Sequence, residues 1–168
     1  MKAFLLLGSN IEDCLHNLKT AHQLIHAEIA PLKKASSIYE TAPWGNDNQP
    51  AFLNQAVEIE TEHTPDLLLK KVKFIEKAMG RKENEKWGPR IIDIDILLMG
   101  SLIYQSDALA IPHPQLHKRR FTLVPLAEIA ADVRHPALNV TIKELLSHCE
   151  DHLEVKKFSG KAFTFLSP

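Results

Sequence analysis

The chain has 168 residues, 45% of them hydrophobic, which is enough for a single globular domain over residues 1–168. The formal net charge of −1 argues against the broad basic surface that binds nucleic acid. No apolar stretch is long enough to span a membrane, and the short apolar start is typical of a core strand rather than a signal peptide. The two cysteines fit a reducing cytoplasm. We also expect a monomer without nucleic-acid or membrane partners.

The first half of the chain predicts a strand, a helix and two further strands. An apolar strand is expected over Lys2–Leu7, and Asn10 is expected to cap a helix that runs to about Ala30. A second strand is expected over Leu32–Thr41, before a loop rich in turn-forming residues. Hydrophobic residues alternate over Phe52–Thr61, which predicts a third strand.

The second half adds a helix, a strand and less regular pieces. Thr64 and Pro65 are a typical helix start, and Gly80 is a natural stop before a polar loop and another apolar strand. This order is that of the βαββαβ ferredoxin-like fold, with a mostly antiparallel sheet and both helices on one face. C-terminal additions would cover the other face and complete a three-layer αβα sandwich of the α+β class: a short strand at Leu102–Gln105 and short helices at Phe121–Ala130 and Thr141–His148.

The last strand of this core carries the strongest functional signal. Because side chains alternate along a strand, Asp93 and Asp95 should share one face while Ile92, Ile94 and Ile96 point to the other. Two neighbouring carboxylates repel each other unless a cation lies between them. Mg²⁺ takes oxygen ligands of this kind and keeps positions for water and substrate phosphates. The pair therefore predicts a magnesium site.

The alternative is an edge strand with two solvated acids. The apolar character of the strand and the unusual Trp87-Gly88-Pro89-Arg90 loop before it favour the metal site. Basic residues also flank the strand, with Arg81 and Arg90 before it and His113 and Arg119 after it. Such a setting suits a polyphosphate, because the metal and the guanidinium groups share its negative charge.

A second constellation lies on the third strand. Leu53, Val57 and Ile59 share one face, which leaves Phe52 and Asn54 together on the other. An aromatic ring beside an amide suits a flat heteroaromatic ligand, because the ring stacks and the amide offers both a donor and an acceptor. Taken alone, the pair would favour a core phenylalanine and an asparagine at a strand bend.

Taken together, these motifs resemble the 6-hydroxymethyl-7,8-dihydropterin pyrophosphokinase family of folate biosynthesis. The resemblance is densest from Gly80-Arg81 through Trp87-Gly88-Pro89-Arg90 to Asp93-Ile94-Asp95-Ile96-Leu97. It extends from Leu6-Leu7-Gly8-Ser9-Asn10 to the run between Phe121 and Ala130, and it includes Tyr39-Glu40-Thr41-Ala42-Pro43, Gln49-Pro50-Ala51-Phe52-Leu53-Asn54 and Pro112-His113-Pro114. The family fold, a ferredoxin-like three-layer sandwich, agrees with the predicted order of elements.

The resemblance implies transfer of the terminal diphosphate of ATP to the hydroxymethyl oxygen of the reduced pterin, with release of AMP. Asp93 and Asp95 would hold two Mg²⁺ ions, and Arg81 and Arg90 would neutralise the transferred group. By the same resemblance, ATP would be bound by Glu76, Arg81, Trp87, Arg90, Ile96, His113 and Arg119. The pterin would be bound by Thr41, Pro43, Trp44, Phe52, Asn54, Trp87, Asp93 and Phe121.

Two alternatives belong to other classes of protein. One is a non-catalytic ferredoxin-like module that binds a pterin or nucleotide, which would not need the charge-neutralising cluster of Arg81, Arg90, Asp93 and Asp95. The other is a nucleotide-sugar transferase with an Asp-x-Asp motif, whose usual larger architecture does not fit this length or order of elements.

Overall fold

The computed structural model describes residues 1–43, 48–81 and 88–160. A six-stranded sheet forms the middle layer, and its strands run in the order β5–β1–β4–β3–β8, with β2 also paired to β4. Each of these pairs is antiparallel. The strands are β1 (Lys2–Ser9), β2 (Leu32–Ala35), β3 (Tyr39–Thr41), β4 (Phe52–Glu60), β5 (Asp93–Met99) and β8 (Val155–Lys157).

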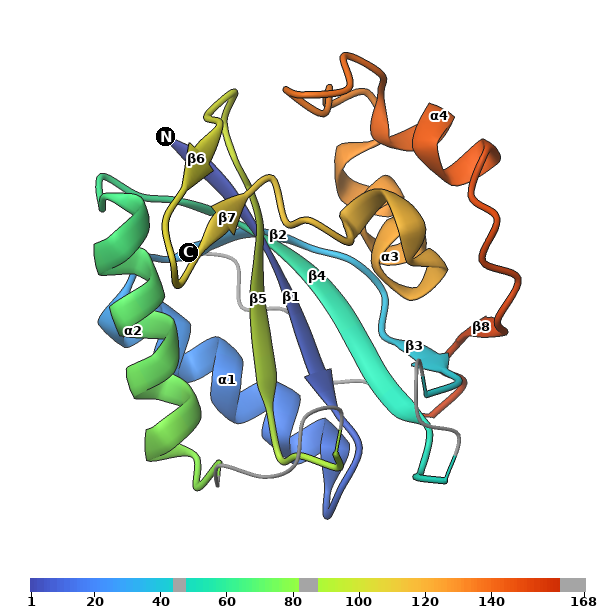
Figure 1. The fold of residues 1–168 in the computed structure, drawn as a ribbon. Coiled ribbons are helices and arrows are strands. Elements are labelled where there is room, and N and C mark those ends of the chain that lie inside the picture. The colour runs from blue at the N-terminus through green and yellow to red at the C-terminus, as the bar shows by residue number, and fades with distance from the viewer. Residues whose placement is uncertain (44–47, 82–87, 161–168) are drawn as a thin grey trace.

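Helices α1 (Cys14–Glu28) and α2 (Pro65–Ala78) cover one face of this sheet (Figure 1). Their buried positions recur at helical spacing, as Leu18 and Ile25 do on α1. The core that they close contains the strand residues Leu5, Leu7, Val57, Ile59, Ile94 and Ile96. Thr64 caps α2 and Pro65 follows it, as the sequence predicts. Because these apolar side chains are buried against the helices, the alternate side chains of each strand point to the opposite face of the sheet.

The opposite face carries the C-terminal additions, as expected. Helices α3 (Arg120–Ala130) and α4 (Ile142–Ser147), preceded by a short 3₁₀ turn at Leu116–Lys118, pack over one part of it. This second core joins strand residues to the two helices: Phe4, Leu6, Ala56, Leu98, Leu123, Leu126 and Ile142. A small hairpin of β6 (Tyr104–Gln105) and β7 (Ala110–Ile111) follows β5 in the chain and precedes the 3₁₀ turn. The three-layer, ferredoxin-like α+β fold is therefore confirmed. Within the described residues, no helix combines the length and apolarity needed to cross a bilayer.

The expected cap of α1 was wrong. Asp13 caps the helix by accepting a hydrogen bond from the backbone N–H of His16 at 3.0 Å. Asn10 is instead buried, and its Oδ1 accepts from the backbone N–H of Arg90 at 2.8 Å. Capping preference depends on local sequence alone, whereas this contact crosses 80 positions of the chain.

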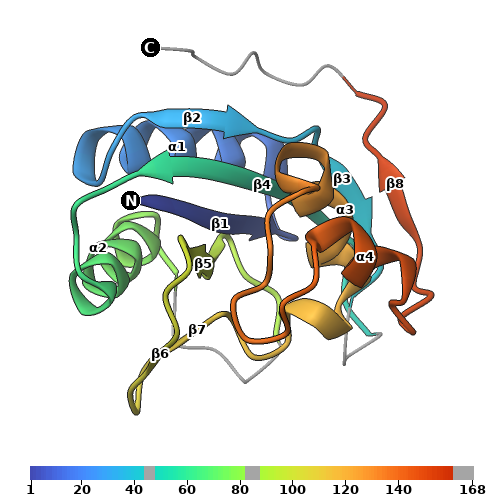
Figure 2. The same cartoon turned by 90° about the horizontal axis from the view of Figure 1, so that it is seen from above.

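The expected strand over Leu32–Thr41 is interrupted, and the short strands β7 and β8 were not expected. Ser36 separates β2 from β3, because its Oγ accepts the backbone N–H of Ala56 at 3.0 Å and so disturbs the regular ladder. Figure 2 shows β8 at the edge of the sheet beside β3. Only its pairing with β3 makes Val155–Lys157 a strand, since this short segment has no hydrophobic alternation of its own.

A buried histidine lies between α1 and the sheet. His22 is 8% exposed, and its Nε2 lies 2.8 Å from Oε1 of Gln55 on β4. The amide of Gln55 in turn donates to the backbone carbonyl of Ser36 at 2.8 Å. Burial lowers the pKa of His22 from 6.5 to about 4, although the bond to Gln55 opposes this shift.

His22 should make folding stability depend on pH in mild acid. Because its pKa is lower in the folded state, the stabilisation is complete above the unfolded value of 6.5 and is lost as pH falls towards about 4. Between about pH 7.5 and about pH 5 this linkage amounts to about 2 kcal/mol. His22→Gln should remove that part of the pH slope in urea unfolding, whereas His26→Gln, at an exposed position of the same helix, should keep it. Equal slopes for the two variants would contradict the assignment.

Candidate active site

The floor of the candidate site is the open part of the sheet face that carries α3 and α4. Three adjacent strands contribute to it in register. Gly8 of β1 lies opposite Asn54 of β4 and opposite Asp93 of β5, and Leu6 lies opposite Asp95. Paired residues of neighbouring strands share a face, so the two acids and the amide look into the same space. The predicted common face of Asp93 and Asp95, and that of Phe52 and Asn54, are therefore both confirmed.

This floor belongs to a pocket of about 550 Å³, measured to its open mouth. Its walls come from separate layers of the fold, with Phe52 on β4 and Phe121 on α3. A guanidinium accompanies each ring, since Arg90 lies 5.8 Å from the Phe52 centroid and Arg119 lies 5.7 Å from that of Phe121. The pocket is lined by Leu6, Gly8, Thr41, Ala42, Gln49, Phe52, Asn54, Arg90, Asp93, Asp95, Arg119 and Phe121.

The amide of Asn54 is held in one orientation. Its Nδ2 donates to Oγ1 of Thr41 at 2.7 Å, and both side chains are buried. Its Oδ1 lies over Gly8, where a Cβ atom would stand only 2.7 Å away. Gly8 is therefore required for close approach rather than for backbone conformation. The fixed amide can present its free N–H and its carbonyl oxygen to the edge of a planar ligand.

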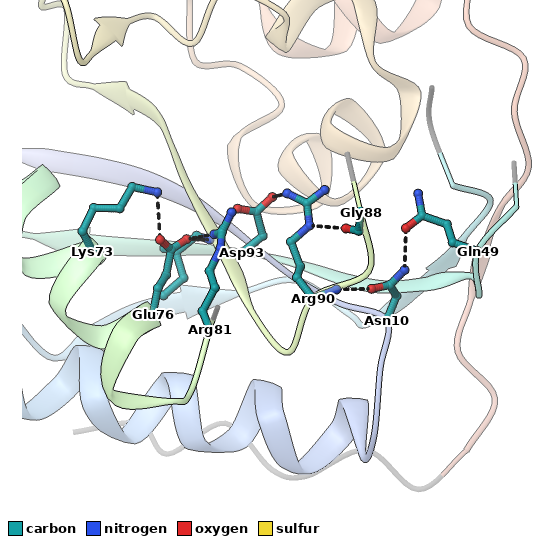
Figure 3. Close-up of polar contacts among 9 residues, drawn as sticks. Asn10, Gln49, Lys73, Glu76, Arg81, Gly88, Arg90 and Asp93 are labelled. Atoms are coloured by element: carbon teal, nitrogen blue, oxygen red, sulfur yellow. Dashed lines mark hydrogen bonds and ion pairs between the residues drawn. The ribbon is translucent and has the colours of Figure 1, made fainter. Parts of the chain in front are cut away.

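A row of alternating charges runs along the acidic end of the site (Figure 3). Glu76 pairs with Lys73 at 2.8 Å and with Arg81. Arg81 also contacts Oδ1 of Asp93 at 2.6 Å, and Arg90 contacts Oδ2 of the same carboxylate at 2.9 Å. Each oxygen of Asp93 thus has its own arginine, as charge-assisted hydrogen bonding favours.

Glu76 has a supporting place in this row. It is 2% exposed, and its Oε1 accepts the backbone N–H of Ile94 at 2.9 Å. It therefore fixes both Arg81 and the start of β5, which explains why an acid on α2 can be buried without being unpaired. Its expected role with ATP stays a prediction.

Burial and mutual repulsion shape the charges of the site. Shielding from water, followed by the neighbouring charge of Asp93, raises the pKa of Asp95 from 3.8 to about 7. Burial lowers the pKa of Arg81, but the carboxylates of Asp93 and Glu76 outweigh it and raise that pKa. The charges of Asp93 and Asp95 therefore oppose each other, while the nearby carboxylates keep the guanidinium group of Arg81 charged.

A second pocket, of about 760 Å³ with its open mouth, adjoins the first across β5. Asp95 lines both pockets, so a ligand that fills both must pass this carboxylate. Ile96 and His113, which the family resemblance assigns to ATP binding, both line the second pocket. Its other lining residues come from α2, β5 and the hairpin: Leu69, Lys73, Ile94, Gln105, Ser106, Asp107, Ala108, Leu109, Ala110 and Pro114.

His113 is a neutral donor in this pocket. Burial, followed by the charge of Arg119, lowers its pKa from 6.5 to about 4. Its Nδ1 accepts the backbone N–H of Gln115 at 3.2 Å, so the ring proton belongs on Nε2. A neutral imidazole N–H can bind a phosphate oxygen without adding charge.

Of the remaining predicted site residues, the structure describes Pro43 but neither tryptophan. Pro43 follows the pocket residues Thr41 and Ala42 and is half-buried. Trp44 and Trp87 lie outside the described residues. Within the described ranges, no group of three or more His, Cys, Asp and Glu side chains could hold a metal ion. A two-carboxylate donor set nevertheless fits Mg²⁺, which takes one or two carboxylates together with substrate phosphates and water.

Several site residues were not anticipated. Gly8 and Gln49 line the first pocket, and Asn10 joins them by donating from Nδ2 to Oε1 of Gln49 at 3.1 Å. All three lie within motifs that carry the family resemblance. Their local sequence favours turns and helix caps, so only those motifs could have pointed to them.

Sheet topology and pockets together define a ferredoxin-like α+β protein with two adjoining pockets, the first of which has two aromatic rings and two guanidinium groups in its walls. The family model of 7,8-dihydro-6-hydroxymethylpterin-pyrophosphokinase matches residues 4–131. A 2-amino-4-hydroxy-6-hydroxymethyldihydropteridine pyrophosphokinase of Aquifex aeolicus is 43% identical over 141 residues, which cover 84% of this chain and 88% of the relative. The corresponding protein of Haemophilus influenzae is 39% identical over 155 residues, 92% of this chain and 96% of the relative. The chain belongs to this pyrophosphokinase family.

Solved structures agree on the fold. A Plasmodium falciparum HPPK-DHPS triple mutant with STZ-DHP superposes with a TM-score of 0.73 at 19% sequence identity. The wild-type protein with pteroate gives a TM-score of 0.70, also at 19% identity. The match covers 87% of this chain but only 42% and 44% of those longer chains. At this level of identity the likeness shows the fold alone.

The close approach at Gly8 gives a first test of the pocket. Gly8→Ala should push the Asn54 amide away from Thr41 and weaken binding of a reduced pterin by about tenfold, the equivalent of one lost hydrogen bond. Fluorescence titration with 6-hydroxymethyl-7,8-dihydropterin measures the change. In an Asn54→Ala background the same substitution should have little further effect, because the clashing atom is gone. If the two substitutions had fully additive effects on the free energy of pterin binding, Gly8 would act through a group other than the Asn54 amide.

Proposed function

We propose that the chain, as a single domain over residues 1–168, transfers the terminal diphosphate of ATP to the hydroxymethyl oxygen of 6-hydroxymethyl-7,8-dihydropterin and releases AMP, as a step of folate biosynthesis. The observation that carries this proposal is the meeting at Asp95 of two pockets, the first of which combines two aromatic rings with the guanidinium groups of Arg90 and Arg119. A reaction that joins a ring-bound hydroxyl to a phosphate chain needs both ligands side by side.

The first pocket suits the pterin. Phe52 and Phe121 would stack on its two faces, and the fixed amide of Asn54 would bind its edge together with backbone groups near Thr41. In this arrangement the hydroxymethyl group of the pterin would point towards β5, where the acids lie. The contributions expected of Pro43, Trp44 and Trp87 remain predictions.

The second pocket suits the nucleotide. Ile96 offers apolar surface for the base, and His113 supplies a neutral N–H for a phosphate oxygen. Arg119 is buried next to Asp95 in the first pocket and stands where the transferred group would arrive. The phosphate chain would therefore cross from one pocket to the other over β5.

Asp93 and Asp95 would hold Mg²⁺, with two ions expected from the family resemblance. When bound, Mg²⁺ supplies charge neutralisation and a template for the phosphate oxygens. The donor set supports this assignment, since the two acids share a face and burial beside Asp93 raises the pKa of Asp95 to about 7. A cation there would relieve a repulsion that the fold otherwise leaves in place.

Arg81 and Arg90 would stabilise the negative charge that spreads over the transferred group. Both contact Asp93 in this structure, at 2.6 and 2.9 Å. A change of side-chain conformation would therefore bring either guanidinium group to a phosphate bound beside Asp93. Each guanidinium has donors beyond the one used on Asp93. The chemistry would then rest mainly on positioning and electrostatics, as a loose phosphoryl-type transition state allows.

The reaction is tested by mixing the protein with ATP, Mg²⁺ and 6-hydroxymethyl-7,8-dihydropterin. AMP and the pterin diphosphate should appear in equal amounts. Pterin binding without AMP would favour the alternative, a non-catalytic ferredoxin-like binding module. Formation of ADP would contradict transfer of a diphosphate. The expected monomeric state and cytoplasmic location stay predictions.

Asp95→Ala should nearly abolish AMP formation while pterin binding stays measurable, because the substitution removes a metal ligand but leaves the aromatic walls. Thermal unfolding should show a folded protein, since one of two repelling carboxylates is lost. Asp132→Ala is a matched control, because Asp132 is an exposed acid paired with Lys143 at 2.7 Å. Near-normal Mg²⁺-dependent rates for Asp95→Ala would remove the proposed metal role.

Arg90→Ala should lower kcat through the loss of about 3 kcal/mol or more of transition-state stabilisation, taking the loss of one oxyanion-hole donor as the guide. Single-turnover measurements separate this effect from binding. Arg134→Ala, which removes an exposed arginine that lines neither pocket, should leave the rate unchanged. If kcat is retained while only substrate affinity falls, Arg90 is a binding residue alone.

A further inference from the structure

A polar cluster outside both pockets joins α3 to the sheet. Glu128 of α3 accepts hydrogen bonds on both carboxylate oxygens. Its Oε1 receives the backbone N–H of Ser37 at 3.0 Å and the Ser37 hydroxyl at 2.9 Å. Its Oε2 receives the Tyr39 hydroxyl at 2.7 Å. We refer to Ser37, Tyr39 and Glu128 as the α3 clasp.

The clasp joins the two walls of the first pocket. On the sheet side, Tyr39 pairs with Asn54 in the β3–β4 ladder, and Thr41 pairs with Phe52. Paired residues share a face, so Tyr39 looks towards α3 from beside the pocket amide. On the helix side, Phe121 lies two turns before Glu128, on the same side of α3. Figures 1 and 2 show α3 next to β3 in both views.

Apolar packing alone does not set the orientation of α3. Leu123 and Leu126 hold the helix on the sheet through the second core. Such burial is non-directional and tolerates small rotations and shifts of a helix. Three bonds to one carboxylate are directional, and they fix the rotation of α3 about its own axis. The distance between the Phe121 and Phe52 rings depends on that rotation.

The charge states of Glu128 and Tyr39 favour a strong hydrogen bond between them. Burial would raise the pKa of Glu128, but the bonds from Tyr39 and Ser37 outweigh it and lower that pKa below its ordinary value. Burial and the contact with Glu128 raise the pKa of Tyr39. The carboxylate thus stays ionised and the phenol stays a donor, which is the stronger type of hydrogen bond.

We infer that Glu128, acting with Tyr39 and Ser37, is a positioning residue that sets the width of the pterin pocket by fixing Phe121 against Phe52 and Asn54. This inference rests on the proposed function, because it names a further residue for the same pocket. Glu128 touches neither substrate, so its effect should fall on pterin affinity and not on the nucleotide.

The test compares KM and kcat for Glu128→Ala, Glu128→Gln and Tyr39→Phe. Glu128→Ala should raise KM for the pterin about five- to tenfold, as loss of a hydrogen-bonded group predicts, with KM for ATP and kcat little changed. Glu128→Gln should restore much of the affinity, because its amide can still bridge Ser37 and Tyr39. Tyr39→Phe should add nothing in the Glu128→Ala background.

Tyr104→Phe is a matched control, because its hydroxyl also donates to a carboxylate, Oδ2 of Asp66, at 2.7 Å. It should leave KM for the pterin unchanged. A fall in melting temperature for Glu128→Ala without any change in pterin KM would overturn the inference, as would equal losses for pterin and ATP. The wild-type protein in the same series tests the proposed function separately: if it forms no AMP, the function fails; if it does and the variants match it, only the inference fails.

Discussion

The site depends on charge balance around one carboxylate. Asp93 has an arginine on each oxygen, and one of these arginines is held from behind by the buried Glu76. This row keeps cations and anions close together without leaving any of them both buried and unpaired. Asp95 lies next to it with a raised pKa, because its shielding from water and the charge of Asp93 outweigh the opposing charges of Arg119 and Lys73. The structure thus brings carboxylates and guanidinium groups together, which is the combination that the proposed transfer of a charged group requires.

The position of β1 allows these charged groups to lie close to the aromatic pocket. As a central strand it places Gly8 between Asn54 and Asp93, so the aromatic pocket and the acidic strand are separated by a residue without a side chain. One sheet face then has two uses. Where α3 and α4 cover it, it is core, and where they stop, it is the floor of the site. Some side chains serve both uses, since Leu6, Ile94 and Ile96 belong to a hydrophobic core and also line a pocket.

Much of this arrangement could be predicted from local patterns. Alternation in the two long strands correctly assigned Asp93, Asp95, Phe52 and Asn54 to an open face, because the period of a strand does not depend on its neighbours. The start of α2 was equally clear, since Thr64 and Pro65 act within one turn. The cap of α1, the break at Ser36 and the strand β8 were not predicted. Each of them depends on a partner far away in the chain.

The sequence by itself determined the fold class, the faces of the long strands and, through its motifs, the family. Residue type and spacing suffice for these, because periodicity and turn chemistry act over a few residues. Only the tertiary structure decided that Asp93 is held by two arginines, that Asp95 joins two pockets, and that Glu128 ties α3 to β3. The physical reason is that hydrogen bonds and ion pairs need distances and angles, which are set only when strands and helices pack against one another.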